Sequence, residues 1–176
     1  MLEWVEAEFA GGPNLRLVAG TAGIRAIEFE PAGPLPADAR HATSPVPVLT
    51  EAVRQLEAYF RGELREFRIP LDLAGTDFQK RVWRQLQTIP YGQTRSYSQI
   101  AEAIGSPQAV RAVGAANGAN PVAIVVPCHR VIGASGKLVG YGGGLPLKKR
   151  LLELEGVVTA SLPGVGPPFR CSDNGS

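Results

Sequence analysis

One short segment of the sequence combines three residues that could act in nucleophilic chemistry. Cys128 is followed directly by His129 and Arg130, and a thiol becomes a good nucleophile when a nearby base or cation lowers its pKa from about 8.5. The preceding residues 121–127 (PVAIVVP) are wholly apolar, so we expect them to be buried and to bring the thiol to the rim of the core. Neighbouring side chains in extended backbone point to opposite faces, so a turn or a bridging water would have to connect the cysteine and the histidine. An inert buried cysteine is the alternative interpretation.

A second candidate is a helix face that carries one long cation among small side chains. Opposite the apolar stripe of the helix expected over residues 106–117 lie Gln108, Arg111, Ala112 and Ala115. Small residues allow close approach, so this face could lie along a nucleic-acid groove while the arginine reaches inside. An alanine-rich helix that packs on a neighbouring helix fits the same pattern.

The cysteine and histidine counts exclude several other kinds of site. The chain holds two of each, Cys128, Cys171, His41 and His129, with no CxxC or HxxxH pair, so we expect no zinc site and no disulfide framework. No run of residues approaches the roughly 20 apolar residues of a membrane helix, and the N-terminus lacks the regions of an export signal. We therefore expect reduced thiols in a cytoplasmic protein with no membrane partner. The glycine run at 140–144 lacks the Lys-Ser/Thr of a phosphate loop.

The first 75 residues are typical of a small mixed α/β unit. Short β-prone runs at 4–9, 15–19 and 24–29 predict an antiparallel sheet. Five prolines between residues 31 and 47 predict a loop or linker. A helix should follow, with Thr50 as its N-cap and Gly62 at its end, and an extended piece near 67–73 should complete the unit.

Helices dominate the prediction after residue 75. Thr76 and Gln79 fit a capping box for a helix that Pro90 stops, and Ser96 and Gln99 fit a second one for a short helix ending at Gly105. The next helix should start at once, with Ser106 as N-cap and a proline at its first position. Two short helices joined through a glycine are a helix-turn-helix candidate. A last helix is expected over 147–155. The predicted fold is therefore α+β, with an N-terminal α/β domain (1–75), a C-terminal, mostly helical domain (76–156) and a flexible tail (157–176).

The segment from about Thr76 to Gly156 resembles one known family in several motifs. IVVPCHRV at 124–131 is similar to the active-site motif of the O6-alkylguanine-DNA alkyltransferases, the methylated-DNA–protein-cysteine methyltransferases. IPYGQTRSYSQIA, AVRAVG, NGANP, VIGASGKLVGYGGG and LLELEG extend the resemblance along the same segment. Residues 1–75 resemble the family's variable N-terminal unit only in outline.

The resemblance implies a DNA repair protein that reacts once. Cys128 would attack the alkyl carbon of O6-alkylguanine, or of O4-alkylthymine, and keep the alkyl group as a thioether that cannot be turned over. His129 would act on the thiol through a water and Glu155 would orient His129. Tyr97 would donate a proton to guanine N3 as the base departs, and Asn120 would hold the local turn. No cofactor or metal takes part.

The resemblance also implies how DNA is bound. The helix-turn-helix would enter the minor groove of double-stranded DNA, with the damaged nucleotide flipped out and Arg111 in its place in the stack. Gln108, Ala112, Ala115 and Arg95 would complete the DNA-binding surface, and the guanine pocket would be lined by Tyr97, Val131, Tyr141 and Gly142. Some family members carry serine where this chain has Gly142, so a wider pocket that tolerates benzyl groups is expected. The expected state is a monomer, with cooperative binding along DNA left open.

Two other functions remain as alternatives, and the charge distribution bears on them. A Cys-His hydrolase would use the same dyad but would turn over, and a DNA-binding regulator without chemistry would use only the helix pair, typically as a dimer. The net charge of the whole chain is +2. Residues 76–156, however, carry 10 Lys and Arg against 4 Asp and Glu, which predicts salt-sensitive DNA binding by this half.

Overall fold

Four strands near the N-terminus form one sheet in the computed structural model, which describes residues 1–157. The strands are β1 (Leu2–Ala7), β2 (Leu15–Ala19), β3 (Ile24–Phe29) and β4 (Ala39–His41), in the order β3-β2-β1-β4. β2 pairs antiparallel with β1 and with β3, as the sequence predicts, but β4 pairs parallel with β1. The three predicted strands are antiparallel as expected, and the sheet is mixed because β4, which the sequence placed in a loop, adds a parallel edge. Residues 39–41 lie between Pro36 and Pro45 and contain no proline, so their backbone can pair with the free edge of β1.

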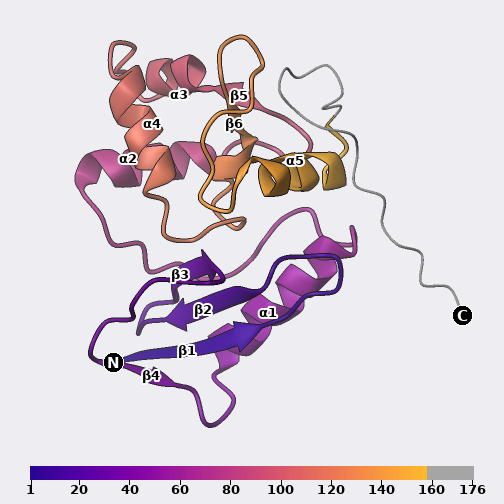
Figure 1. Ribbon diagram of the computed structural model, residues 1–176. Coiled ribbons are helices and arrows are strands. Elements are labelled where there is room, and N and C mark those ends of the chain that lie inside the picture. The colour runs from indigo at the N-terminus through magenta and orange to yellow at the C-terminus, as the bar shows by residue number, and fades with distance from the viewer. Residues whose placement is uncertain (158–176) are drawn as a thin grey trace, which may run out of the picture.

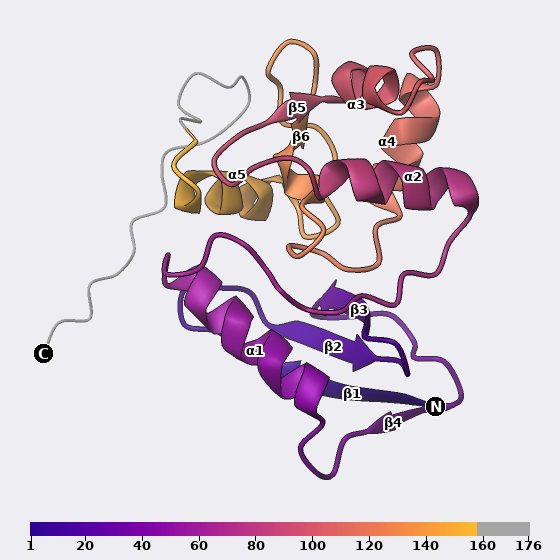
Figure 2. The ribbon, with the colours of Figure 1, turned by 180° about the vertical axis from the view of Figure 1, so that it is seen from behind.

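A single helix, α1 (Pro47–Phe60), covers one face of this sheet, as Figures 1 and 2 show from opposite sides. The helix begins three residues before the expected cap Thr50, because Pro47 occupies its first turn, where a missing N–H costs nothing. It ends before Gly62, whose φ of 73° is the left-handed conformation that glycine adopts most easily.

The second half of the described chain is mostly helical and lies against the sheet half (Figure 1). Its helices are α2 (Asp77–Leu86), α3 (Tyr97–Ala103), α4 (Val110–Gly118) and α5 (Leu145–Leu154). Both predicted capping boxes are present, at Thr76 with Gln79 and at Ser96 with Gln99. Strands β5 (Arg95–Ser96) and β6 (Val131–Ile132) pair in parallel, and a 3₁₀ turn, η1, spans Cys128–Arg130.

Two helix starts in this second half also differ from the prediction. Ser106 does not cap α4: its carbonyl accepts the N–H of Ala109 in a separate turn, and the helix begins at Val110. Gln108 therefore precedes the helix instead of lying on it. α5 begins at Leu145, two residues early, with a proline in its first turn. No helix among residues 1–157 is long and apolar enough to cross a bilayer.

One continuous core joins the two halves. The Ile27 N–H of β3 donates to the Pro121 carbonyl at 2.9 Å, and the Ala123 N–H donates to the Ile27 carbonyl at 3.3 Å. These bonds lay the apolar run 121–127 along the edge of the sheet, where the run is mostly buried, as predicted. The expected boundaries at 75 and 156 stay predictions, and the tail 158–176 with Cys171 lies outside the described residues.

Candidate active site

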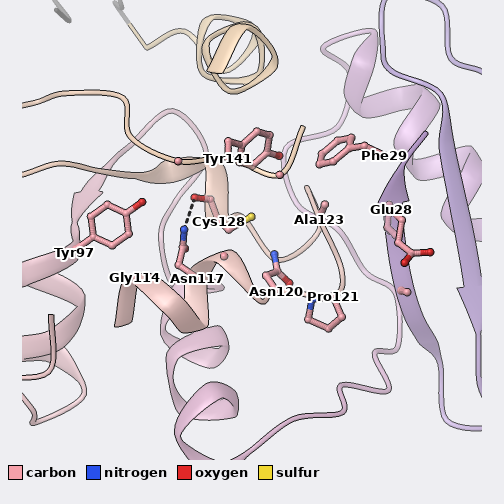
Figure 3. A pocket seen from close by; sticks show the side chains of 15 residues that line it. Glu28, Phe29, Tyr97, Gly114, Asn117, Asn120, Pro121, Ala123, Cys128 and Tyr141 are labelled. Carbon is pink, nitrogen blue, oxygen red and sulfur yellow. Dashed lines mark hydrogen bonds between the residues drawn. The ribbon is translucent and has the colours of Figure 1, made fainter. Parts of the chain in front are cut away.

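Cys128 lies in a cavity of about 540 Å³ between the two halves of the molecule. β3 supplies one wall through Ala26, Ile27, Glu28 and Phe29, and the helical half supplies the rest. In Figure 3 the thiol lies between Tyr97 on one side and Ala123 and Phe29 on the other. A cavity of this size is in the range of sites that bind small organic molecules.

The thiol is nearly buried and needs help to ionise. Cys128 is 6% exposed at the start of the 3₁₀ turn. Burial raises the pKa of the Cys128 thiol, while the Asn120 side chain, the positive charge of Lys148 and backbone N–H groups act in the opposite direction. Because burial dominates, the group is a thiol at neutral pH, and reaction requires a base that takes its proton.

His129 and Glu155 form a fully buried pair behind the cysteine. The Nε2 atom of His129 lies 2.7 Å from Oε1 of Glu155, and neither side chain is exposed. Burial raises the pKa of Glu155, but hydrogen bonds from His129 and Arg130 outweigh it and lower the pKa to about 2. Burial lowers the pKa of His129, against the charge of Glu155. The pair is therefore a neutral imidazole and a carboxylate.

This protonation state fixes the role of each imidazole nitrogen. A carboxylate only accepts hydrogen bonds, so Nε2 of His129 carries the proton and donates it to Glu155. The other nitrogen, Nδ1, is buried and has no hydrogen-bond partner within residues 1–157. A general base needs a lone pair that is not already accepting a hydrogen bond, and the lone pair of Nδ1 meets this requirement. The 3₁₀ turn replaces the extended backbone that would separate the two side chains.

Glu155 has two further side-chain donors that sequence reasoning missed, and the Gly92 N–H also donates to its Oε2 at 3.4 Å. Nε and Nη2 of Arg130 donate to its two oxygens at 2.8 Å and 2.9 Å, and the Tyr59 hydroxyl donates to Oε1 at 2.6 Å. Arg130 also donates to the Ile89 carbonyl at 2.7 Å. Tyr59 comes from α1, in the other half of the chain, and nothing in the local sequence indicates this contact.

Two asparagines fix the backbone around the cysteine. Asn120 accepts the Val122 N–H at 3.0 Å and donates to the Val126 carbonyl at 2.8 Å, so it spans the tight turn between them. Ile124 in this turn has a φ of 71°, a costly conformation for a β-branched residue. Asn117 of α4 donates to the Cys128 carbonyl (Figure 3).

Three of the four expected guanine-pocket residues line the cavity: Tyr97, Tyr141 and Gly142. The Tyr97 hydroxyl donates to the Val139 carbonyl at 3.2 Å, and the Tyr97 pKa is raised by burial and then by the charge of Cys128. The Tyr141 hydroxyl is buried without a hydrogen-bond partner in the described part of the chain. Its ring packs on Phe29 with centroids 5.5 Å apart.

Val131 is the exception, because it does not line the cavity. Its N–H donates to the Cys128 carbonyl, and its own carbonyl accepts Nζ of Lys148 at 2.6 Å. Lys148 is fully buried and also donates to the carbonyls of Val139 and Gly140, so it ties down the loop that leads into the cavity. Burial lowers the Lys148 pKa to about 8. The burial of Lys148 could have been predicted from the sequence, because Lys148 precedes the buried Leu151 and Leu152 by one helical turn and so shares their face of the helix.

The expected DNA-binding residues occupy an exposed surface beside the cavity. Arg111, Ala112 and Ala115 are exposed on α4, and Gln108 is exposed in the turn before it. The same helix contributes Gly114, Asn117 and Gly118 to the cavity lining. Arg95 lies apart from the cavity lining, and its guanidinium donates to the Thr94 carbonyl at 2.8 Å and to Gln93 at 3.2 Å.

Curated sequence relatives share a single description. A methylated-DNA–protein-cysteine methyltransferase of Mycolicibacterium paratuberculosis is 74% identical over 104 residues, and its Mycobacterium bovis counterpart is 71% identical. Each alignment covers 59% of this chain and 63% of the relative, so less than two thirds of these relatives is matched. The protein of the same description from Methanosarcina acetivorans is 63% identical over 60% of this chain and 68% of its own.

Solved structures and family models cover more of the chain. "Mycobacterium tuberculosis OGT in complex with DNA" is 50% identical, with a TM-score of 0.80 over 88% of this chain and 93% of that one. An O6-methylguanine DNA methyltransferase from Methanococcus jannaschii is 25% identical, with a TM-score of 0.61 over 94% and 99%. The model described as 6-O-methylguanine DNA methyltransferase, ribonuclease-like domain, matches residues 14–73, and that described as its DNA binding domain matches residues 77–157. The chain belongs to the O6-methylguanine DNA methyltransferase family.

Proposed function

We propose that this protein repairs O6-alkylguanine in double-stranded DNA by transferring the alkyl group irreversibly to Cys128. The observation that carries the proposal is a nearly buried thiol that lines a cavity. The next residue in the sequence is a neutral histidine, which is hydrogen-bonded to a buried carboxylate. Family membership supports the same chemistry, and O4-alkylthymine would present an equivalent alkyl–oxygen bond.

The transfer is an in-line displacement at the alkyl carbon. Nδ1 of His129 takes the thiol proton through a bridging water, and Glu155 stabilises the imidazolium that forms. The thiolate of Cys128 then forms a bond to the alkyl carbon as the bond from that carbon to O6 breaks. The electron pair of the broken bond remains on guanine, which takes a proton at N3. The thioether product has no leaving-group chemistry to restore the thiol, so each molecule reacts once.

Tyr97 is the proton donor for the departing base. Its hydroxyl is occupied by the Val139 carbonyl here, and it exchanges that acceptor for guanine N3 when the base enters. Because the Tyr97 pKa is raised, the hydroxyl keeps its proton until the base accumulates negative charge. The proton taken by His129 restores the tyrosine through solvent, so the overall step moves one proton from sulfur to guanine.

Arg111 takes the place of the flipped nucleotide in the stack. The small residues Ala112 and Ala115 beside it leave room for the backbone of α4 to approach the minor groove. Flipping a base costs a few kcal/mol, which an inserted side chain offsets in part. Contacts to backbone and shape carry little sequence information, so the chemistry of the pocket selects the lesion. A cytoplasmic location fits a protein that depends on a reduced thiol.

The proposal is tested by intact mass after incubation with a duplex that contains one O6-methylguanine. We expect the protein to gain the mass of one methyl group and the Cys128→Ala variant to gain none. An unchanged wild-type mass refutes the proposal. Methyl loss from the DNA in excess of the amount of protein indicates turnover, as a hydrolase would show, and also refutes it.

A further inference from the structure

One contact of the reactive network comes from the sheet half of the molecule. Tyr59 lies on α1, is fully buried, and donates its hydroxyl to Oε1 of Glu155 at 2.6 Å. The same oxygen lies 2.7 Å from Nε2 of His129 and 2.9 Å from Nη2 of Arg130. The bond joins positions 96 residues apart in the chain, so it forms only when the two halves are packed together.

Packing alone does not require this hydroxyl. The Tyr59 ring contacts Phe60, Phe67 and Tyr91, with centroid distances of 5.5 Å, 5.3 Å and 6.2 Å. A phenylalanine would fill the same aromatic cluster without a buried polar group that needs a partner. The role of the Tyr59 hydroxyl is therefore its hydrogen bond to Glu155, the carboxylate that holds His129.

We propose that Tyr59 is a positioning residue for alkyl transfer, through which the N-terminal half sets the orientation and charge of Glu155 toward His129. Three donors on one oxygen hold the carboxylate in a single orientation, and each takes up part of its negative charge. Without the hydroxyl, Oε1 keeps only His129 and Arg130, so the carboxylate is held less firmly and more of its charge acts on the imidazole. The inference rests on the proposed function, because it assigns a role within that reaction.

Burial supports this arrangement. Desolvation, followed by the charge of Glu155, raises the pKa of the Tyr59 hydroxyl far above its usual value, so the group remains a donor at any pH at which the protein is folded. Arg130 acts on Tyr59 in the opposite direction, because its positive charge would favour the phenolate.

The test is Tyr59→Phe, measured first with free O6-benzylguanine so that DNA binding plays no part. We expect reaction with Cys128 to slow by about tenfold, since small misplacements of a catalytic group can cost up to about 100-fold. The second readout is the NMR titration of the histidine rings. The chain has two histidines, so exposed His41 serves as an internal reference in protein freed of any tag. We expect the His129 titration to move to higher pH in the variant.

Tyr91→Phe is the matched control. It also removes one tyrosine hydroxyl from the same aromatic cluster, but that hydroxyl donates to the Leu154 carbonyl at 3.1 Å, within the helical half, instead of to Glu155. We expect thermal stability to fall by a similar amount in both variants and the His129 titration to move only in Tyr59→Phe. Wild-type rate and His129 titration in Tyr59→Phe, or the same shift in both variants, overturn the inference. Failure of the proposed function is a separate outcome, in which the wild-type protein is itself not alkylated.

Discussion

The two halves of the molecule differ in charge as well as in fold. Residues 1–75 carry 7 Lys and Arg against 11 Asp and Glu, whereas residues 76–156 carry 10 against 4. The sheet half is therefore acidic and the helical half basic, although the whole chain is close to neutral. Under the proposed function, the half that carries Cys128 and Arg111 is also the half whose charge attracts DNA. A total charge near zero thus conceals one basic half of the chain.

The halves also contribute differently to the site. The helical half supplies the thiol, the base, the carboxylate and the tyrosine of the proposed reaction. The sheet half supplies no reacting atom, but β3 forms one wall of the cavity and Tyr59 reaches the carboxylate. A half without reacting groups can therefore still determine how those groups are held.

Glu155→Gln should have the largest effect, because it changes the tautomer of the base. An amide can donate to Nε2 of His129, which would place the ring proton on Nδ1 and remove the lone pair that accepts the thiol proton. By analogy with the asparagine variant of a serine protease triad, we expect methyl transfer to slow by up to about 10,000-fold. Single-turnover kinetics with a methylated duplex measures it. A loss of less than about tenfold would show that the carboxylate does not control the base.

Acid should separate the halves by neutralising the same carboxylate. The folded-state pKa of Glu155 is about 2, below its usual value of 4.5. The stability it contributes is therefore complete above pH 4.5 and is lost as the pH falls toward 2. We expect the free energy of unfolding, followed by denaturant titration, to fall by a few kcal/mol over this range. The Glu155→Gln variant, which has no carboxyl group there, should show a flatter dependence, and an equally steep one would contradict the assignment.

Arg111→Ala tests the DNA-binding half directly. Loss of the inserted side chain should slow repair of duplex DNA by about 30-fold, the equivalent of ~2 kcal/mol of flipping energy. The reaction with free O6-benzylguanine should be unchanged. Arg54→Ala is the control from the acidic half, since Arg54 is an exposed arginine paired with Glu51 at 2.6 Å. An equal loss of rate on both substrates, or an equal loss of rate in the two variants, would contradict a DNA-binding role for Arg111 in the helical half.

Gly142→Ser should have the smallest effect, on substrate preference alone. A Cβ at Gly142 meets no atom within 4 Å, so the serine fits without strain and narrows the cavity. We expect reaction with O6-benzylguanine to slow roughly tenfold relative to O6-methylguanine, the size of discrimination that one small group produces in a pocket. Competition between the two substrates measures the ratio. An unchanged ratio would show that Gly142 does not limit the size of the alkyl group.

Features encoded in neighbouring residues could be predicted from the sequence. Both capping boxes depend on residues three positions apart, and the glycine that ends α1 needs only its own backbone freedom. The residues proposed to act with Cys128 were predicted because the motif around it resembles that of a known family. The pairing of His129 with Glu155 in the structure agrees with that expectation.

Features that depend on tertiary contacts could not be predicted. β4 exists because β1 leaves a free edge, which overrides the prolines on either side of residues 39–41. The contact between Tyr59 and Glu155 forms only when the two halves pack together, and no sequence pattern predicts a contact between residues so far apart in the chain. Ser106 has the residue type of an N-cap, but its carbonyl is used in a turn of its own. In each case a contact distant in sequence or a competing local bond decides the outcome.

Peptide mass mapping with limiting protein and excess methylated duplex tests whether Cys128 takes up the alkyl group once and irreversibly. We expect one methyl group per protein molecule, located on Cys128, and an amount of repaired guanine equal to the amount of protein. Methyl on another residue, or repaired guanine in excess of the protein, would contradict it.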